Sequence, residues 1–87
     1  MRIRITKKDI EEGIPGNVSM CPVALCLRRK LRSNKIRVDV DSVDIGEERI
    51  ELPISATRFI FKYDRAKDKN KMKSVTFNIN IAKNQIK

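Results

Sequence analysis

The sequence predicts a single α+β domain in which an antiparallel sheet of four or five strands carries two helices on one face, in the order β-α-β-β-β-α-β. Three observations support this fold class. Apolar and polar residues alternate near both ends of the chain, short alternating runs fill its middle, and prolines open two stretches with helical spacing of apolar residues. The 87 residues are enough for one hydrophobic core, so we expect one domain over residues 1–87.

Alternation predicts the first and the last strand. In residues 1–6 two isoleucines alternate with Arg2 and Arg4, which is typical of a half-buried strand. Residues 75–81 alternate valine, phenylalanine and isoleucine with threonine and asparagine. Each segment therefore has one face for the core and one face for solvent.

The middle of the chain alternates in shorter runs that turn residues interrupt. Three further strands are expected at residues 36–40, 43–45 and 50–52. The polar segment 7–12 is expected to be a connector without regular structure, and the segment 82–87 is expected to be frayed.

The positions of two prolines and the spacing of apolar residues predict two helices. Pro22 suits the first turn of a helix that Cys21 or Ser19 would cap. Pro53 opens the second helix, over residues 54–66, which has two unlike faces. The apolar face of this second helix is predicted to turn toward the core and comprises Ala56, Phe59, Ile60 and Tyr63.

The composition excludes several classes of chemistry. Lys and Arg number 20 against 11 Asp and Glu, and a net charge of +9 favours an anionic partner such as nucleic acid or an acidic protein. The absence of histidine removes Cys–His and Ser–His catalysis and the commonest metal ligand. No apolar run approaches the roughly 20 residues of a membrane span. We therefore expect no enzyme activity, no cofactor, no metal and no membrane contact.

The two cysteines indicate the redox state of the compartment, and one of them is a candidate reactive residue. Cys21 and Cys26 would lie roughly 140° apart around a helix, which disfavours a disulfide between them and indicates reduced thiols in a cytoplasmic setting. Cys21 at a helix N-terminus could be a nucleophile, or simply a small buried thiol. The preceding loop, residues 13–19, could cradle an anion, or simply close onto its own helix.

The positive charge is concentrated in the last third of the chain. Residues 58–87 hold nine bases and two acids (9 − 2 = +7), whereas residues 1–57 hold eleven bases and nine acids (11 − 9 = +2). The predicted binding surface is the cationic helix face together with the Lys-rich loop that follows it. It comprises Arg58, Phe61, Lys62, Arg65, Lys67, Lys69, Lys71 and Lys73.

Phe61 is the unusual member of that surface, because it is an aromatic side chain among three cations. It could stack on a base or anchor in a partner, while the lysines contact phosphates. The alternative is a solvated basic face with Phe61 buried under the Lys-rich loop.

Six carboxylates gather in the predicted central strands. They could mimic phosphates, dock the basic half of a second copy, or only keep the protein in solution. These residues are Asp39, Asp41, Asp44, Glu47, Glu48 and Glu51.

Several short motifs resemble those of a group of small uncharacterised phage, prophage and bacterial proteins. They are Gly13-Ile14-Pro15-Gly16, Cys21-Pro22-Val23-Ala24-Leu25, and Leu52-Pro53 ahead of an Ala-x-x-Phe-Ile-x-x-Tyr-Asp helix. The resemblance implies the same element order and a viral origin, with the host cytoplasm as the compartment. The chain departs from the group's pattern at Asp9, where the group has histidine, at Cys26, where it has alanine, and in a longer Lys-rich loop.

Two functional hypotheses follow, and a third has less support. The first is a small non-enzymatic, virus-encoded protein that contacts nucleic acid or a nucleoprotein through the basic surface. The second is an inhibitor or adaptor that docks on a host protein, as a homodimer with acidic and basic faces opposed. The third is an enzyme, which would require Cys21 to be a reactive thiol.

Overall fold

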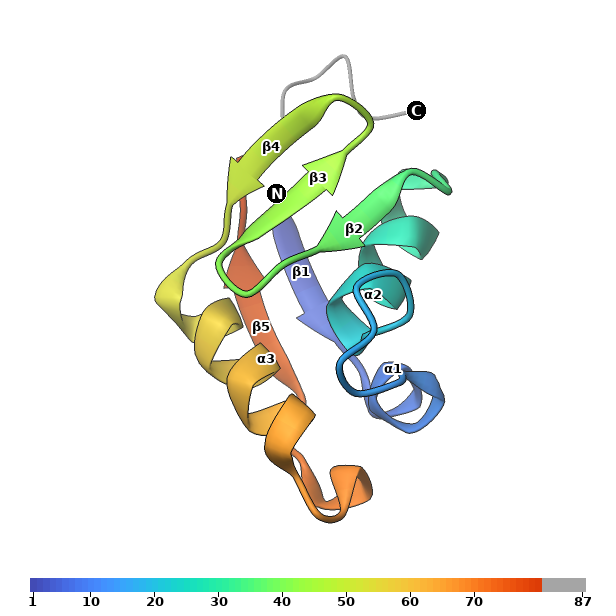
Figure 1. Ribbon diagram of the computed structural model, residues 1–87, viewed down its shortest axis with the longest axis vertical. Coiled ribbons are helices and arrows are strands. Elements are labelled where there is room, and N and C mark those ends of the chain that lie inside the picture. Colours follow the sequence, from blue (N-terminus) through green and yellow to red (C-terminus); the bar gives the residue numbers. More distant parts are fainter. Residues whose placement is uncertain (81–87) are drawn as a thin grey trace.

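The computed structural model describes residues 1–80 and shows a mixed α+β fold with three α-helices and two antiparallel sheets (Figure 1). In chain order the elements are β1 (Arg2–Ile5), α1 (Lys7–Glu12), α2 (Pro22–Leu31), β2 (Ile36–Val38), β3 (Ser42–Ile45), β4 (Glu48–Glu51), α3 (Ile54–Arg65), a short 3-10 helix η1 (Lys69–Lys71) and β5 (Val75–Asn78). The end of the predicted last strand, at residue 81, and the segment expected to be frayed lie outside the described residues.

The prediction of one sheet is wrong, because the strands form two separate sheets. β1 pairs with β5, and β2, β3 and β4 form a meander in that order. Other groups occupy one outer edge of each sheet, at β1 and at β2. The Val38 amide at the edge of β2 donates to the Val18 carbonyl over 2.8 Å. At the free edge of β1, the Cys26 thiol donates to the Arg4 carbonyl over 3.1 Å, and Lys30 donates to the Arg2 carbonyl. The helices correspondingly flank β1 and β5 on either side, rather than covering one face of a continuous sheet (Figure 1).

The segment expected to be a connector is the helix α1. Its N-terminus has a capping box: the Asp9 amide donates to the Thr6 hydroxyl over 3.2 Å, and the Thr6 amide donates to the Asp9 carboxylate over 2.9 Å. Arg29 of α2 also donates to this carboxylate, over 2.7 Å to one oxygen and 3.1 Å to the other. A helix of this length is not stable in isolation. The buried Ile10 and these polar contacts therefore stabilise α1.

The other helix boundaries follow from backbone geometry. Cys21 is the N-cap residue of α2, with Pro22 in the first turn as predicted. The helix stops after Leu31, where Arg32 adopts the left-handed conformation with φ 53° and ψ 44°. The Lys-rich loop after α3 contains the 3-10 turn η1.

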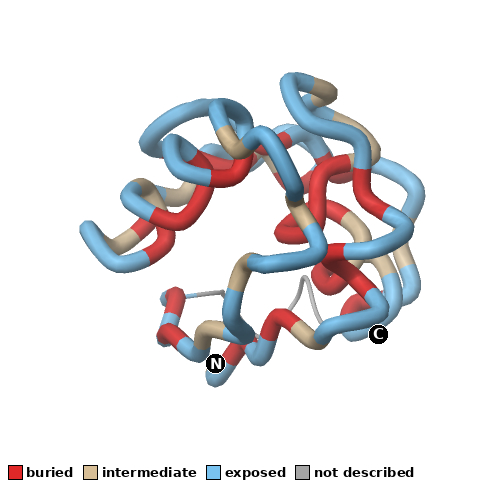
Figure 2. Tube along the Cα trace, turned by 90° about the horizontal axis from the view of Figure 1, so that it is seen from below, coloured by how far each residue is buried: buried red, intermediate tan, exposed pale blue. Residues whose placement is uncertain are grey.

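One hydrophobic core joins the two sheets and the helices. Buried positions recur along the inward sides of the helices and strands (Figure 2). Ile3, Ile5 and Phe77 supply the inner face of the β1–β5 sheet, while Val43 and Ile45 come from the meander. The alternation of the first and last strands is therefore confirmed, with one face in the core and the other in solvent.

Candidate functional site

Helix α3 sets the geometry of the candidate site, because its two faces have different surroundings. The predicted apolar face is buried: Ala56, Phe59, Ile60 and Tyr63. The Tyr63 hydroxyl donates to the Ile10 carbonyl over 2.9 Å, and burial raises the pKa of Tyr63 to about 12. With this face anchored in the core, the cationic side of α3 has a defined direction.

The cationic face of α3 is open to solvent. Arg58, Lys62 and Arg65 are all exposed. Among residues 1–80 there are three ion pairs, and none of them involves these three side chains. Their charges are therefore not neutralised by neighbouring carboxylates in the described part of the chain.

Phe61 is not buried under the Lys-rich loop, so that part of the alternative is wrong. The side chain is 52% exposed, and the guanidinium carbon of Arg65 lies 3.6 Å from the centroid of its ring. This cation–π contact covers one side of the aromatic ring and restrains Arg65. The two residues form one exposed pair along the outer side of α3.

A groove runs between α3 and the segment that leads into β5. It has a volume of about 430 Å³, and its lining residues are Ser55, Arg58, Phe59, Lys62, Lys71, Met72, Lys73, Ser74 and Val75. Four of these side chains are cations and none is a carboxylate. The structure thus assembles one cationic groove, which we call the basic groove, from two segments separated in sequence.

Lys69 has a different role from the one predicted for it. Its ammonium group donates to the carbonyl of Glu11 over 2.8 Å and to that of Gly13 over 2.7 Å. These carbonyls belong to the C-terminal end of α1, where a cation satisfies acceptors that the helix leaves free. Lys69 is therefore a structural residue that ties the loop to α1, and it does not line the basic groove.

Lys7 makes the reciprocal contact from α1 to the loop. Its ammonium group donates to the carbonyls of Asn70 and Met72, over 3.3 and 3.0 Å. Together with Lys69, it holds the loop at several points, which places Lys71 and Lys73 beside α3. Lys67 is exposed but does not line the groove.

Two further exposed cations lie on the strand that pairs with β5, and the sequence-based prediction of the binding surface did not include them. Arg2 and Arg4 are exposed on β1, which pairs with β5 immediately after the groove. Their alternation with buried isoleucines was visible in the sequence, but the pairing of the two ends of the chain was not. Only that pairing places these arginines beside β5, the strand that begins at the end of the groove.

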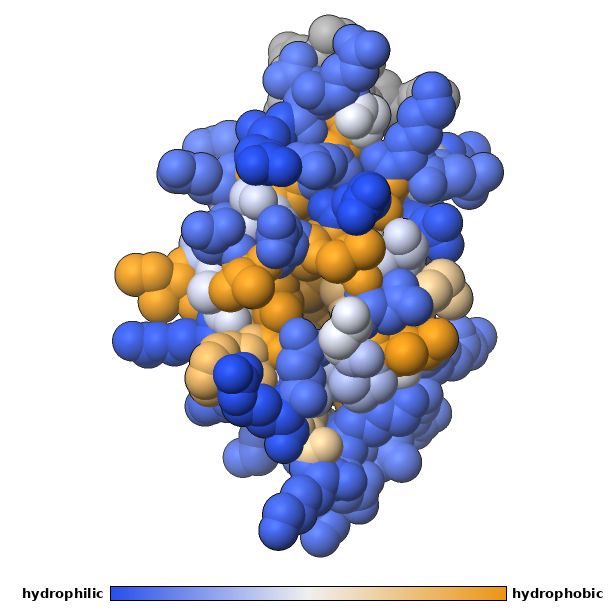
Figure 3. Space-filling view, viewed as in Figure 1, coloured by the Kyte–Doolittle hydropathy of each residue, from blue (hydrophilic) through white to orange (hydrophobic). Residues whose placement is uncertain are grey.

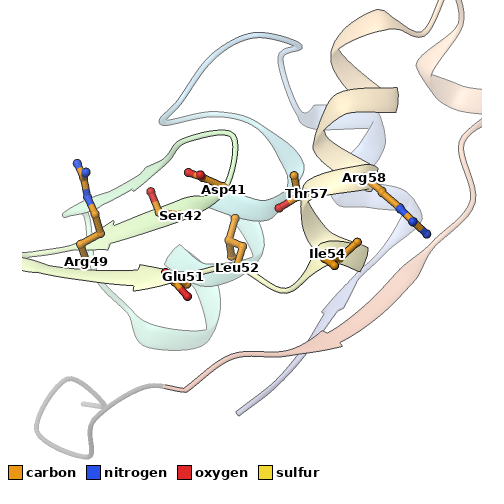
Figure 4. A pocket seen from close by; sticks show the side chains of 8 residues that line it. All are labelled: Asp41, Ser42, Arg49, Glu51, Leu52, Ile54, Thr57 and Arg58. Carbon is orange, nitrogen blue, oxygen red and sulfur yellow. The ribbon is translucent and has the colours of Figure 1, made fainter.

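The acidic meander adjoins the basic groove at Arg58, which lines both sites, and it carries both signs of charge. A pocket of about 540 Å³ lies between the meander and the start of α3, and it is lined by Asp41, Ser42, Arg49, Glu51, Leu52, Ile54, Thr57 and Arg58 (Figure 4). Arg58 points away from Asp41 and Glu51 in this view. Two carboxylates and two guanidiniums give this pocket no strong preference for anions.

The glycine-rich loop before α2 already uses its amide groups. The Gly16 amide donates to the Asp64 carboxylate over 2.9 Å, and the Ser19 and Met20 amides both donate to the Asn17 side chain over 3.0 Å. Gly16 has a positive φ of 74°, which suits glycine. This geometry favours the interpretation that the loop closes onto its own fold.

Neither cysteine has the surroundings of an activated thiol. Cys21 and Cys26 are both free and buried. Burial raises the pKa of each thiol, so the reactive thiolate is disfavoured at neutral pH. The arrangement matches the interpretation of Cys21 as a small buried residue.

Cys21 also lines a small pocket. Figure 3 shows that hydrophobic side chains gather around a hollow on one face of the molecule. The pocket has a volume of about 160 Å³ and is lined by Gly16, Asn17, Val18, Cys21, Val38, Asp39, Val40, Ile60 and Asp64. It is smaller than the 300 Å³ or so typical of ligand pockets. Its two carboxylates also distinguish it from the basic groove.

Comparisons with protein-family models, with curated proteins and with solved structures give no match. None of the helices within residues 1–80 is long and apolar enough to cross a membrane. The same residues contain no group of three or more His, Cys, Asp or Glu side chains that could hold a metal ion.

Proposed function

We propose that this protein is a small, non-enzymatic nucleic-acid-binding domain that holds a phosphate backbone in the basic groove. The observation that carries the proposal is the lining of the groove, which has four cations and no carboxylate. Lys and Arg side chains are the principal phosphate contacts of nucleic-acid-binding proteins. The four cations are Arg58, Lys62, Lys71 and Lys73.

The construction of the groove supports this function. One wall is α3, which the core anchors through Tyr63, and the other is the loop that Lys7 and Lys69 attach to α1. Phe59 and Val75 contribute apolar surface between the walls. The cations therefore project from supported backbone, and ordering them on binding requires less loss of conformational freedom than ordering a free loop.

The salt dependence of binding tests the proposed function. We expect the wild-type protein to bind a fluorescently labelled oligonucleotide, with a log–log slope of affinity against salt of about −3 to −4 for four neutralised phosphates. Fluorescence anisotropy between about 50 and 200 mM salt measures that slope. A labelled polyglutamate peptide is the control for general attraction to polyanions. Absence of binding at the lowest salt, or equal affinity for the peptide, would contradict the proposal.

A second candidate function is self-association through opposite charges. Five carboxylates of the meander region have no ion-pair partner within residues 1–80, whereas Asp44 pairs with Arg49 over 2.9 Å. These carboxylates and the basic groove are complementary surfaces on two copies of the chain. The five carboxylates are Asp39, Asp41, Glu47, Glu48 and Glu51.

Sedimentation at two salt concentrations distinguishes this second function from the first. Self-association through charge predicts dimers at low salt that dissociate at high salt, because surface electrostatics are screened. Added oligonucleotide should compete with the second copy for the same groove. A monomer at both salt concentrations would rule out this mode of assembly.

A further inference from the structure

The outer face of the β1–β5 sheet presents the side-chain types that read DNA bases. β1 exposes Arg2 and Arg4, and β5 exposes Thr76 and Asn78. The antiparallel register places Arg2 opposite Asn78 and Arg4 opposite Thr76. Four polar side chains therefore form a compact block on two neighbouring strands.

The backbone beneath these side chains is held in place. The other face of the two strands packs in the core through Ile3, Ile5 and Phe77. The Arg4 carbonyl accepts a hydrogen bond from the Cys26 thiol, over 3.1 Å. A base-reading surface needs such support, because a displaced backbone would misalign the hydrogen bonds to the bases.

Cations lie beside β1 and in the segment that leads into β5. Next to β1, the exposed Lys30 of α2 donates to the Arg2 carbonyl. Next to β5, Lys71 and Lys73 line the basic groove. Figure 1 shows the same order of elements, with β1 and β5 side by side between α2 and α3. Exposed cations therefore lie beside β1 and at the start of β5, around the four polar side chains of the ribbon.

We propose that the β1–β5 ribbon enters the major groove of double-stranded DNA and reads its sequence, while the flanking cations contact the two phosphate backbones. The major groove of B-form DNA, about 12 Å wide, admits a two-stranded β-ribbon. Arg pairs with guanine and Asn with adenine in that groove through two hydrogen bonds each, and Thr contacts either base edges or the thymine methyl group. This inference rests on the proposed function and adds to it a ligand class and a source of sequence selectivity.

The surface suits duplex DNA better than other nucleic acids. The major groove of an RNA duplex is deep and narrow, and side chains cannot read it. Single strands are bound mainly by stacking on exposed aromatic rings. The chain has four aromatic residues, and three of them, Phe59, Tyr63 and Phe77, are buried. The fourth, Phe61, lies under Arg65 on α3 rather than on the ribbon.

The test begins with the intact protein and a pool of random-sequence DNA duplexes. We expect repeated selection to enrich a short sequence motif, and the enriched duplex to bind at least about tenfold more tightly than its scrambled version or the equivalent RNA duplex. Binding without enrichment of a motif, or equal affinity for DNA and RNA duplexes, would overturn this inference. Either result would still agree with phosphate binding in the basic groove. Absence of binding to any nucleic acid would overturn both.

The double variant Arg2→Lys, Arg4→Lys then separates base reading from charge. Lysine keeps the positive charge but lacks the planar two-donor geometry of arginine. We expect affinity for the enriched duplex to fall roughly 5- to 150-fold for each arginine–guanine pair that the substitutions remove, and affinity for the scrambled duplex to change little. Equal reductions on both duplexes would overturn base reading by these arginines. Circular dichroism of the variant checks that the fold is retained.

Discussion

Replacing Asp9 with alanine is expected to destabilise the protein by about 2 to 4 kcal/mol, because the Asp9 carboxylate both caps α1 and links α1 to α2. Asp9 is 2% exposed and closes the capping box of α1 with Thr6. It also accepts two hydrogen bonds from Arg29, which links α1 to α2. Urea unfolding of the wild type and the variant measures the difference in the free energy of unfolding.

The matched control is Glu12→Ala, which removes another carboxylate of the same helix. Glu12 forms only an exposed pair with Lys8, at 3.9 Å. Such pairs contribute between 0 and about 1 kcal/mol, so we expect little change in stability. A similar destabilisation in both variants would show that Asp9 has no special role.

The effect of Asp9 should depend on pH with a defined sign. Burial raises the pKa of Asp9, but hydrogen bonds from Arg29 and Thr6 outweigh it, and the net shift is downward from 3.8. The carboxylate therefore stabilises the fold fully above the pKa of 3.8 that it has when unfolded. This contribution is lost as the pH falls through the lower folded value. The difference between wild type and Asp9→Ala should accordingly shrink below pH 3.8.

Reversing two charges in the basic groove is expected to abolish most of the nucleic-acid affinity. In the double variant Arg58→Glu, Lys62→Glu, two phosphate-binding cations are removed and two carboxylates repel the backbone. Removing the two cations alone weakens binding by about 50-fold near 0.1 M salt and makes the log–log salt slope shallower by about 2. Both side chains are exposed, so the fold should remain. Anisotropy titrations at several salt concentrations measure both quantities.

The control for net charge is Lys35→Glu, Arg37→Glu, which makes the same chemical change outside the groove. Lys35 and Arg37 are exposed, at and just before β2. Neither residue lines the groove, and salt at 0.1 M screens exposed charges that do not contact the ligand, so we expect affinity to fall by less than about tenfold. If affinity falls equally in both double variants, the protein attracts nucleic acid through its overall charge and the groove is not a site.

Local patterns correctly predicted several parts of the fold. The spacing of Phe59, Ile60 and Tyr63 predicts the buried face of α3, and alternation predicts the buried faces of β1 and β5. These features depend on the repeat of a helix or strand, which the sequence displays directly. The helix α1 was missed, although Thr6 and Asp9 carry the residue types of a capping box, because an otherwise polar segment shows little apolar periodicity.

The division into two sheets could not be predicted from patterns within single strands. It depends on which groups occupy the strand edges, and those groups come from remote segments: Lys30 and Cys26 at β1, and Val18 at β2. Alternation shows which face of a strand is buried. It does not show which neighbour accepts or donates its backbone hydrogen bonds.

Residue types and their spacing are enough to show that the protein is basic, lacks histidine, and has a helix at α3 with one apolar and one cationic side. Which cations share a surface follows from the three-dimensional fold. In the fold, Lys71 and Lys73 lie next to α3, whereas Lys69 binds carbonyl groups at the end of α1. Arg2 and Arg4 lie beside β5. The physical reason is that helix and strand periodicity acts over a few residues. The position of a charged side chain in space depends on long-range strand pairing and on hydrogen bonds between distant segments.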